Sequence, residues 1–197
     1  MLILASASPR RSELLTQAGY RFRVHPAHIN EDPRAGEEPI AYVTRLAREK
    51  AEAVLRELTL AGKPPEGNNP ESEPLTVLGA DTTVTLDGEI LAKPTDAADA
   101  GRMLRLLSAR THRVITGVAV ATATRTEVAA EVTAVRFVTL SDAEIADYVA
   151  SGEPMDKAGA YAIQGRAARW IPRIEGCYFN VMGLPLALVS SMLEACG

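Results

Sequence analysis

The sequence is poor in cysteine, and this scarcity limits both the sites that it can hold and its setting. Only two cysteines occur among the 197 residues, Cys177 and Cys196, and they form no C-x-x-C pair. We expect no structural disulfide, because Cys196 is the penultimate residue and chain ends are often frayed. Two cysteines without a disulfide favour a reducing, cytoplasmic setting.

Long hydrophobic runs are also absent, and so is an excess of positive charge. No apolar run approaches the roughly 20 residues that span a bilayer. Residues 1–6 lack the basic region that opens a secretory signal. We therefore expect neither a membrane span nor a signal peptide. The net charge of −4 gives no basic field that would favour nucleic acid as a partner.

The remaining composition is typical of a soluble globular protein, with 47% hydrophobic and 23% charged residues. The length of 197 residues, without an internal repeat, fits a single domain over residues 1–197, with or without two lobes. Residues 62–74 are rich in proline, glycine, asparagine and glutamate. We interpret them as a flexible loop rather than a domain boundary.

The stretch around which the chain is organised is residues 78–94, which is predicted to form a β-hairpin. Its first strand is β-branched, and Asp87-Gly88 is a strong two-residue turn signal. Asp81 is unusual there, because aspartate is depleted in strands and the preceding residues are apolar. A simple register places Asp81 and Lys93 on opposite faces, whereas a bulge would bring them to the same face. Asp81 could instead be an edge-strand residue that caps a turn.

Residues 6–19 are predicted to include a helix with two arginines in its first turn. Ser8 is a natural N-cap, and Pro9 suits the first helical position. Arg10 and Arg11 oppose the helix macrodipole there, at a cost of some tenths of a kcal/mol. Their position makes sense if an anion binds beside the backbone N–H groups, which predicts a phosphate site. The alternative is a pair of solvated arginines on the surface.

A second helix, predicted over residues 40–58, carries a lysine within its apolar stripe. Lys50 comes three residues after Ala47 and four before Val54, and both of these belong to the stripe. Such a lysine either extends its ammonium to solvent or points into a cleft that holds a negative group. The preceding loop, residues 25–39, is acidic. It is either simply solvated or supplies a carboxylate to a hard cation.

The other elements follow from hydrophobic alternation, caps and terminators. Strands are predicted at residues 2–5, 20–24, 111–122, 127–139 and 169–171. Helices are predicted to begin at Thr95 or Asp96, to run from the capping box of Ser141 and Glu144 to residues 151–152, and to span 186–194. We interpret His112, at the start of a strand, as a hydrogen-bonded structural histidine.

Residues 152–165 form a second dense stretch, rich in glycine and small residues around Tyr161 and Gln164. Small residues suggest a backbone that a ligand approaches closely. Gln164 carries both a donor and an acceptor, which suits reading the edge of a base. A glycine-rich turn with a solvated glutamine would explain the same residues equally well.

Together these stretches resemble the Maf family of nucleoside triphosphate pyrophosphatases along nearly the whole chain. The motifs that carry the resemblance are Ala-Ser-x-Ser-Pro-Arg-Arg at 5–11, Glu31 and Glu38-Pro39, Arg45-Leu-Ala-x-x-Lys50-Ala, Gly-Ala-Asp-Thr at 79–82, Lys93-Pro94, Val-Ile-Thr-Gly-Val at 114–118, Asp156-Lys-Ala-Gly-Ala-Tyr161 with Ile-Gln-Gly at 163–165, and Val-Met-Gly-Leu-Pro at 181–185. Each motif alone is weak, but their joint order and spacing are specific.

The resemblance implies an α/β fold of the inosine-triphosphatase-like (Maf) kind, with a twisted mixed sheet, flanking helices and a cleft between two lobes. It also implies hydrolysis of a nucleoside triphosphate between its α and β phosphates, with a divalent cation, Mg²⁺ or Mn²⁺. Residues 156–165 are similar to the subgroup that acts on dTTP and UTP, whereas the 7-methyl-GTP subgroup differs there. The implied partner is a small-molecule nucleotide, and the family also allows a homodimer.

The resemblance assigns roles to individual residues. Asp81 matches the family's proton acceptor, and Arg10, Thr82 and Gln164 match positions that set substrate selectivity. We expect Asp81 to orient and deprotonate a water molecule, and Glu31 to hold the cation together with Asp81. The expected ligands of the triphosphate are Ser8, Arg10, Arg11, Lys50 and Lys93.

Two departures from the family pattern stand out. Asn30 occupies a position where an acidic residue often precedes the glutamate, which would weaken a metal contact, and the loop at 62–74 is longer than expected. Two other functions stay open at this point. One is a pyrophosphatase for another or a modified nucleotide, and the other is a non-catalytic, nucleotide-binding regulator of septum formation. A regulator has no need of a water-activating acid, so Asp81 favours the enzyme.

Overall fold

The structure is a computed structural model that describes residues 1–60 and 74–196. Its strands are β1 Leu2–Leu4, β2 Phe22–Val24, β3 Thr76–Leu86, β4 Glu89–Leu91, β5 Thr111–Ala121, β6 Thr126–Arg136 and β7 Arg173–Glu175. Its α-helices are α1 Pro9–Gln17, α2 Pro39–Leu60, α3 Ala97–Leu107, α4 Asp142–Ala150, α5 Tyr178–Met182 and α6 Leu186–Cys196. Its 3₁₀ helices are η1 Glu153–Asp156, η2 Ala158–Ala160 and η3 Arg166–Trp170. The loop predicted at 62–74 lies, except for Pro74, outside the described residues.

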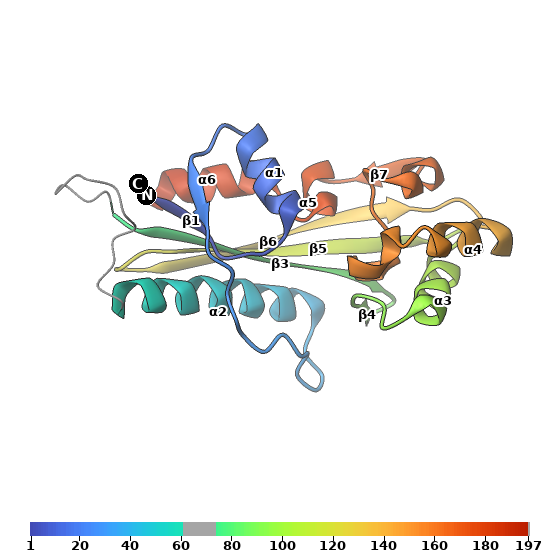
Figure 1. Ribbon diagram of the computed structural model, residues 1–197, viewed down its shortest axis with the longest axis horizontal. Helices are drawn as coiled ribbons and strands as arrows, with labels where there is room; N and C mark the ends of the chain where they lie inside the picture. Colours follow the sequence, from blue (N-terminus) through green and yellow to red (C-terminus); the bar gives the residue numbers. More distant parts are fainter. Residues whose placement is uncertain (61–73, 197) are drawn as a thin grey trace.

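The strands form one mixed, seven-stranded sheet with helices on both faces, which confirms the predicted α/β class (Figure 1). The hydrogen-bonded order is β2-β1-β3-β5-β6-β7, and the short β4 pairs with β3. β1 runs parallel to β2 and β3, and the other pairs are antiparallel. α1 and α6 lie on one side of the sheet and α2 lies on the other. The long strands β3 and β5 connect the two ends of the molecule.

The predicted hairpin is present, but its ladder is short. β3 and β4 pair in the predicted register, at Val84–Leu91, Thr85–Ile90 and Leu86–Glu89. Because β4 ends at Leu91, Lys93 lies beyond the ladder, and neither the simple register nor a bulge sets the direction of its side chain. The main partner of β3 is β5, which pairs with it from Val77 to Thr85.

Two glycines let α2 lie very close to the sheet. A Cβ atom at Gly79 would come 2.1 Å from the carbonyl oxygen of Ala47, and one at Gly117 would come 2.3 Å from that of Val43. Both distances are far below van der Waals contact, so a larger residue at either position would push the helix away. Gly117 pairs with Asp81 across β3 and β5. α2 therefore touches the sheet directly beside Asp81.

The described residues contain four buried clusters, and we group the three larger ones into two parts at opposite ends of β3 and β5 (Figure 1). In the first part, which we call the aliphatic half, α1, α2 and α6 pack on the sheet. Its buried side chains include Ile3, Leu4, Leu14, Leu15, Val54, Val77, Leu78, Val118, Val120, Leu184 and Val189. In the second part, the aromatic half, α3, α4 and η3 pack around Phe137, Tyr148, Tyr161 and Trp170.

The caps predicted for the two α-helices of the aromatic half are confirmed. The side chain of Asp96 accepts a hydrogen bond of 2.8 Å from the backbone N–H of Asp99 at the start of α3. Ser141 and Glu144 form the predicted capping box at the start of α4. These bonds satisfy donors that the first turn of a helix otherwise leaves without a partner.

The strand predicted at 169–171 is wrong, because these residues belong to η3 and its end. The backbone N–H of Ile171 bonds the carbonyl of Ala168 at 3.2 Å, which closes a helical turn. Trp170 is buried between two less buried neighbours, and this alternation imitates a strand. The ring of Trp170 packs edge to face on Tyr148, with centroids 5.0 Å apart. Packing in the aromatic half therefore decides the local conformation.

Candidate active site

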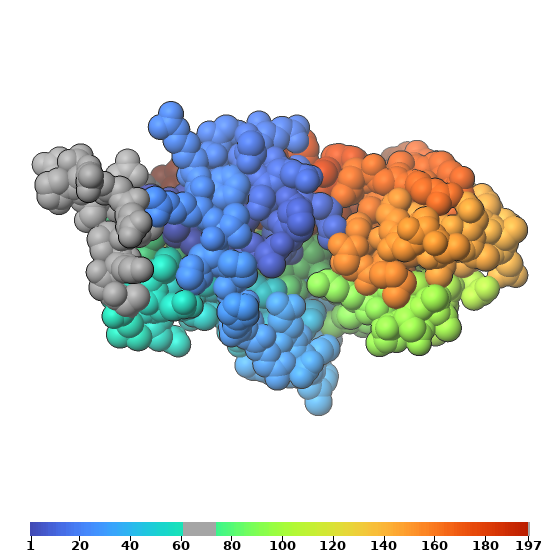
Figure 2. Space-filling model, viewed as in Figure 1, coloured from blue at the N-terminus to red at the C-terminus, as the bar shows by residue number. Residues whose placement is uncertain are grey.

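A cavity of about 560 Å³ is lined by residues of both halves. Figure 2 shows a hollow on this face, where the blue N-terminal segments approach the orange ones. Every residue to which the sequence analysis assigns a catalytic, ligand-binding or selectivity role lines this cavity: Ser8, Arg10, Arg11, Glu31, Lys50, Asp81, Thr82, Lys93 and Gln164. The fold thus brings these side chains together from distant parts of the chain, while their individual roles stay predictions.

The cavity lies at a gap in the sheet. Along one edge of β3, pairing with β1 ends at Leu78 and pairing with β4 starts only at Val84. Between these points, no described strand pairs with β3 on that edge. Asp81 and Thr82 have side chains on opposite faces of β3, as strand alternation requires. Both can border one cavity because the sheet does not continue between them.

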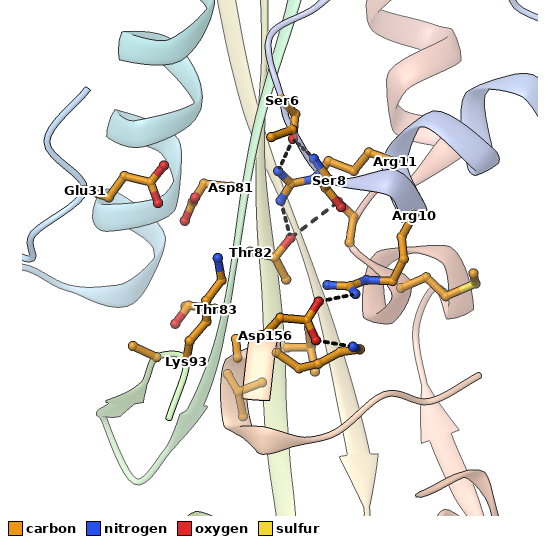
Figure 3. Close-up of a pocket in the computed structure, with 18 of the residues that line it drawn as sticks. Ser6, Ser8, Arg10, Arg11, Glu31, Asp81, Thr82, Thr83, Lys93 and Asp156 are labelled. Atoms are coloured by element: carbon orange, nitrogen blue, oxygen red, sulfur yellow. Dashed lines mark hydrogen bonds and ion pairs between the residues drawn. The ribbon is translucent and has the colours of Figure 1, made fainter. Parts of the chain in front are cut away.

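The most buried charged cluster joins Lys50 to two carboxylates. The ammonium Nζ of Lys50 lies 2.7 Å from Asp81 Oδ1 and 2.8 Å from Glu31 Oε1. The Lys50 side chain is only 8% exposed, so these contacts compensate a cation that burial would otherwise destabilise strongly. Figure 3 shows Glu31 and Asp81 side by side at the cavity. Of the two interpretations of Lys50, the one in which it points at a negative group is confirmed.

The loop that carries Glu31 is tied to α2 by several hydrogen bonds and ion pairs. The hydroxyl of Tyr42 donates to the carbonyl oxygen of Glu31 at 2.9 Å, and Arg45 binds the two carboxylate oxygens of Glu37 at 2.6 and 2.7 Å. The bonds from Arg45 lower the pKa of Glu37 to about 2. Burial opposes ionisation of Glu31, but the hydrogen bond and charge of Lys50 outweigh it and keep the pKa of Glu31 below its usual value. The acidic loop is therefore more than a solvated segment.

Arg11 is buried rather than solvated, and its guanidinium binds mainly to the protein itself. Its Nε donates to Gly183 O at 2.8 Å, Nη1 donates to Ser6 Oγ at 3.0 Å and Ala80 O at 2.9 Å, and Nη2 donates to Thr82 Oγ1 at 3.0 Å. These acceptors are neutral, and Arg11 forms no ion pair with any residue in the described ranges. Burial lowers the pKa of Arg11 below its usual value. One of its five N–H groups stays available to a ligand.

Arg10 differs from its neighbour, although both lie in the first turn of α1. Its side chain is 25% exposed, and its Nη1 lies 3.3 Å from Asp156 Oδ2 in η1 (Figure 3). Asp156 also pairs with Lys157. Burial opposes ionisation of Asp156, but the hydrogen bond and charge of Lys157, together with Arg10, keep the pKa of Asp156 below its usual value. Asp156 and Lys157 line the cavity, and the sequence analysis assigned them no role although they open a motif of the resemblance.

Ser8 directly precedes α1, as predicted, but its side chain makes no capping hydrogen bond. Its own backbone N–H donates to the Ser6 hydroxyl at 3.2 Å. Pro9 occupies the first helical turn. The N–H groups of Arg10 and Arg11 are therefore not capped by Ser8, and they lie at the positive end of the helix beside the cavity.

Lys93 and Gln164 are exposed polar residues of the predicted site, as is Glu31. Figure 3 shows the side chain of Lys93 extending toward Asp81, and its charge contributes to the lowered pKa of Glu31. Gln164 lies between η2 and η3 and also lines the cavity. Neither side chain makes a hydrogen bond or ion pair with another residue in ranges 1–60 and 74–196. Both can therefore contact a ligand without first breaking a bond to the protein.

His112 is a structural residue, as predicted. Its ring is 1% exposed, and its Nε2 lies 2.8 Å from the hydroxyl of Tyr161. Burial lowers the pKa of His112 to about 3, so the ring is neutral at physiological pH. Its ring also packs edge to face on Phe137 and Tyr161. These contacts place it in the aromatic core rather than in the cavity.

The carboxylates suit a divalent cation that arrives with the substrate. No group of three or more His, Cys, Asp or Glu side chains that could hold a metal occurs in the part of the chain that the structure describes. Glu31 and Asp81 converge on the same ammonium, so their oxygens lie close enough to share one ligand. Mg²⁺ is commonly bound by one or two carboxylates together with substrate phosphates. The residues present therefore fit the predicted cation, and Glu31 and Asp81 are the carboxylates that would hold it.

None of the helices in the described ranges is long and apolar enough to cross a membrane.

Comparison with known proteins agrees with the motifs. The family model described as "Maf-like protein" matches residues 1–196. A protein of Koribacter versatilis is 53% identical over 196 residues, which cover 100% of this chain and 94% of that protein. A protein of Citrifermentans bemidjiense is 52% identical over 198 residues, covering 100% and 95%. One of Salmonella typhimurium is 50% identical over 193 residues, covering 98% and 91%. All three relatives are named dTTP/UTP pyrophosphatase.

Proposed function

This chain belongs to the Maf family, and we propose on that basis that it hydrolyses dTTP and UTP to the monophosphate and pyrophosphate. The proposal extends to modified pyrimidine nucleotides with the same base edge. The names of three relatives at about 50% identity support it. The structural observation that carries it is a cavity in which a buried carboxylate, Asp81, lies beside cations that have donors left for a phosphate.

The proposed phosphate site consists of positive groups on two sides of the cavity. Arg11 contributes a buried positive charge that has no ion-pair partner in the described chain. Lys93 contributes an ammonium whose N–H donors make no bond with a described residue. Arg10 and the first N–H groups of α1 add further donors. A triphosphate carries several negative charges, and a site of this kind stabilises the additional charge that develops on the leaving group.

Asp81 is the proposed proton acceptor. Lys50 holds Oδ1, whereas Oδ2 makes no hydrogen bond with a described residue and can bind a water molecule. In the proposed step the water oxygen bonds to the α-phosphorus, the bond from that phosphorus to the bridging oxygen breaks, and the water proton passes to Asp81. Pyrophosphate leaves toward the positive groups. A divalent cation held by Glu31 and Asp81 would neutralise phosphate charge.

Gln164 is the proposed reader of the base. Uracil and thymine present an N3–H donor between two carbonyl acceptors, and an amide side chain has both a donor and an acceptor to match them. Cytosine lacks that donor. This role is supported by two observations: the side chain of Gln164 is exposed at the cavity, and it makes no hydrogen bond with another described residue.

The test is pyrophosphate release from dTTP, UTP, CTP, ATP and GTP, each with Mg²⁺, Mn²⁺ or a chelator. We expect metal-dependent release from dTTP and UTP, and a fall in kcat on the order of 10²-fold or more in Asp81→Asn. Asp87→Asn is the matched control, because Asp87 is an exposed turn residue of the same hairpin and asparagine tolerates its positive φ.

Three other results would change the proposal. Near-normal turnover in Asp81→Asn would remove Asp81 from its role. Release from another nucleotide alone would keep the chemistry and exclude dTTP and UTP as substrates. Nucleotide binding without any release would favour the non-catalytic regulator.

Two further expectations belong with this proposal. A cytoplasmic location is supported by the two free cysteines, Cys177 and Cys196, which suit a reducing compartment. A homodimer is supported by the family resemblance, and size-exclusion chromatography with light scattering tests it.

A further inference from the structure

The segment that carries Gln164 is held at both of its ends by two residues outside the cavity lining. The backbone N–H of Ala162 donates to the hydroxyl of Tyr148 at 3.2 Å. The backbone N–H of Arg166 donates to Glu153, at 3.1 Å from Oε1 and 3.4 Å from Oε2. Tyr148 and Glu153 are themselves joined by a hydrogen bond of 2.9 Å. Gln164 therefore lies in a short loop whose two ends bind to one connected pair of side chains.

The pair is well placed to act as a fixed support. Tyr148 is completely buried in α4, and its ring packs edge to face on Trp170 with centroids 5.0 Å apart. Burial and the bond to Glu153 raise the pKa of Tyr148 above its usual value, so its hydroxyl keeps its proton. That hydroxyl can therefore accept from Ala162 and donate to Glu153 at the same time. Bonds that form a chain of this kind restrain both ends of the loop together.

The carboxylate of Glu153 also explains the glycine that follows Gln164. A Cβ atom at Gly165 would lie 1.9 Å from Glu153 Oε1 and 2.7 Å from its Cδ. The carboxylate thus presses directly on the backbone of the loop, and Gly165 is the residue that permits this contact. The backbone N–H of Gly165 bonds to the carbonyl of Ala162 at 3.1 Å, which closes the turn around Gln164.

We propose that Glu153 and Tyr148 are positioning residues for base selectivity, which act by fixing the backbone of residues 162–166 and thereby the side chain of Gln164. The inference rests on the proposed function, because it assumes that Gln164 reads the base. Neither residue lines the cavity, so each would act on the base through Gln164 rather than by direct contact. Their side chains make no bond with Lys50, Glu31 or Asp81 in the described chain, so their loss should change selectivity while leaving the chemical step in place.

The experiment measures kcat and KM for UTP and CTP in the full chain and in a set of variants. Glu153→Ala leaves the N–H of Arg166 and the hydroxyl of Tyr148 without their acceptor. We expect the ratio of kcat/KM for UTP to that for CTP to fall about tenfold, through a higher KM for UTP with kcat nearly unchanged. Tyr148→Phe, which keeps the ring, should move the ratio in the same direction. Glu153→Gln keeps a carbonyl acceptor and should restore the wild-type ratio.

A double-mutant cycle tests the contact with Gly165. Gly165→Ala alone should reduce selectivity, because its Cβ meets the carboxylate of Glu153. In Glu153→Ala the space for that Cβ is open, so the double variant should lose no more selectivity than Glu153→Ala alone. Glu175→Ala is the control, because Glu175 is an exposed glutamate of β7 that pairs only with Arg173 among the described residues. Circular dichroism checks that each variant is folded.

The outcomes separate this inference from the proposed function. If wild type hydrolyses UTP and Glu153→Ala keeps its KM and its selectivity, the positioning role is wrong. If wild type hydrolyses no nucleotide, the proposed function fails, and the ratio of the dissociation constants for UTP and CTP, measured by calorimetry, replaces the kinetic ratio. A ratio that shifts in Glu153→Ala and returns in Glu153→Gln then supports the inference. An unchanged ratio, or no binding at all, overturns it. If Glu153→Ala does not fold, the other two variants test the inference. A UTP-to-CTP ratio that falls in Tyr148→Phe but not in Glu153→Gln supports it, and an unchanged ratio in Tyr148→Phe overturns it.

Discussion

The two halves that meet at the cavity differ in how they hold polar groups. Among the described residues, three charged residues are buried, Arg11, Lys50 and Asp81, at whole-residue exposures of 8%, 6% and 8%. All three lie where the aliphatic half meets the cavity. The buried polar groups of the aromatic half are neutral, such as His112 and Tyr161. Charge is thus concentrated where β3 and α2 are in backbone contact.

The groups that would act on the phosphates and the group that would read the base are therefore held in place in different ways. The charged groups that would act on phosphate are fixed by regular elements and by bonds such as that between Lys50 and Asp81. Gln164, which would act on the base, is exposed in a turn whose flanking backbone N–H groups donate hydrogen bonds to Tyr148 and Glu153. Each half can therefore be altered without the other, and the following predictions test that separation.

The largest effect is expected from the two adjacent arginines of α1. Arg11→Ala should lower the free energy of unfolding by about 3 kcal/mol, because it removes the donor to the buried carbonyl of Ala80 and leaves the carbonyl of Gly183 with only the 3.4 Å bond from the Thr82 hydroxyl. Arg10→Ala should lower it by less than about 1 kcal/mol, because its pair with Asp156 is partly exposed. Urea unfolding followed by circular dichroism measures both. Equal effects of the two substitutions would contradict the different roles assigned to them.

The next effect concerns pH and the aromatic half. The pKa of His112 is about 3 in the folded protein, against 6.5 for a free side chain, because burial disfavours the charged ring. Between these values the unfolded chain binds a proton that the folded chain does not. The free energy of unfolding should therefore fall as the pH is lowered from 6.5 toward 3, by up to about 1.4 kcal/mol per pH unit from this group.

Substitution isolates the contribution of His112. In His112→Gln the fall in stability between about pH 6 and pH 4.5 should be shallower than in wild type, by about 1 kcal/mol per pH unit. His28→Gln is the matched control, because His28 is exposed, and it should leave the slope unchanged. The measurement is urea unfolding at a series of pH values. Equal slopes in wild type and His112→Gln would show that the buried ring does not cause the loss of stability at acidic pH.

The smallest effect is expected from the base-reading turn. Gln164→Ala should lower the ratio of kcat/KM for UTP to that for CTP about tenfold, while kcat for UTP stays close to wild type, because the charged cluster is untouched. Gln17→Ala, at an exposed position of α1, is the control. A large fall in kcat with an unchanged ratio would mean that Gln164 contributes to the chemical step rather than to base selectivity.

The charged side of the site could be predicted from the sequence because simple periodicities place its residues. Lys50 falls within the apolar stripe of its helix, and Asp81 interrupts a buried strand, so both are visible as anomalies. Their mutual contact could not be derived, because it depends on how closely α2 approaches the sheet. The bonds of Arg11 were missed for a similar reason: three of its acceptors lie in segments far from α1 in sequence.

The aromatic side was less predictable. The sequence around Trp170 suggests a strand, because a buried residue lies between two less buried ones. The packing of Trp170 on Tyr148 in the fold is what distinguishes the observed helical turn from that strand. Lys93 lies past the last pair of its hairpin, where alternation no longer applies. Glu153 belongs to the dense stretch at 152–165, but its contacts with the backbone of Gly165 and Arg166 could not be derived from that stretch, because they depend on how the loop after it folds back.

The backbone contact between α2 and the sheet determines which core positions can change during evolution. At Gly79 and Gly117 the helix rests on main-chain atoms, so the spacing between Lys50 and Asp81 does not depend on which aliphatic side chains fill the surrounding core. Those side chains can be exchanged over evolutionary time without moving the charges. A single added carbon at either glycine would displace the helix and the ammonium that it carries. The two smallest residues of the region therefore tolerate the least change.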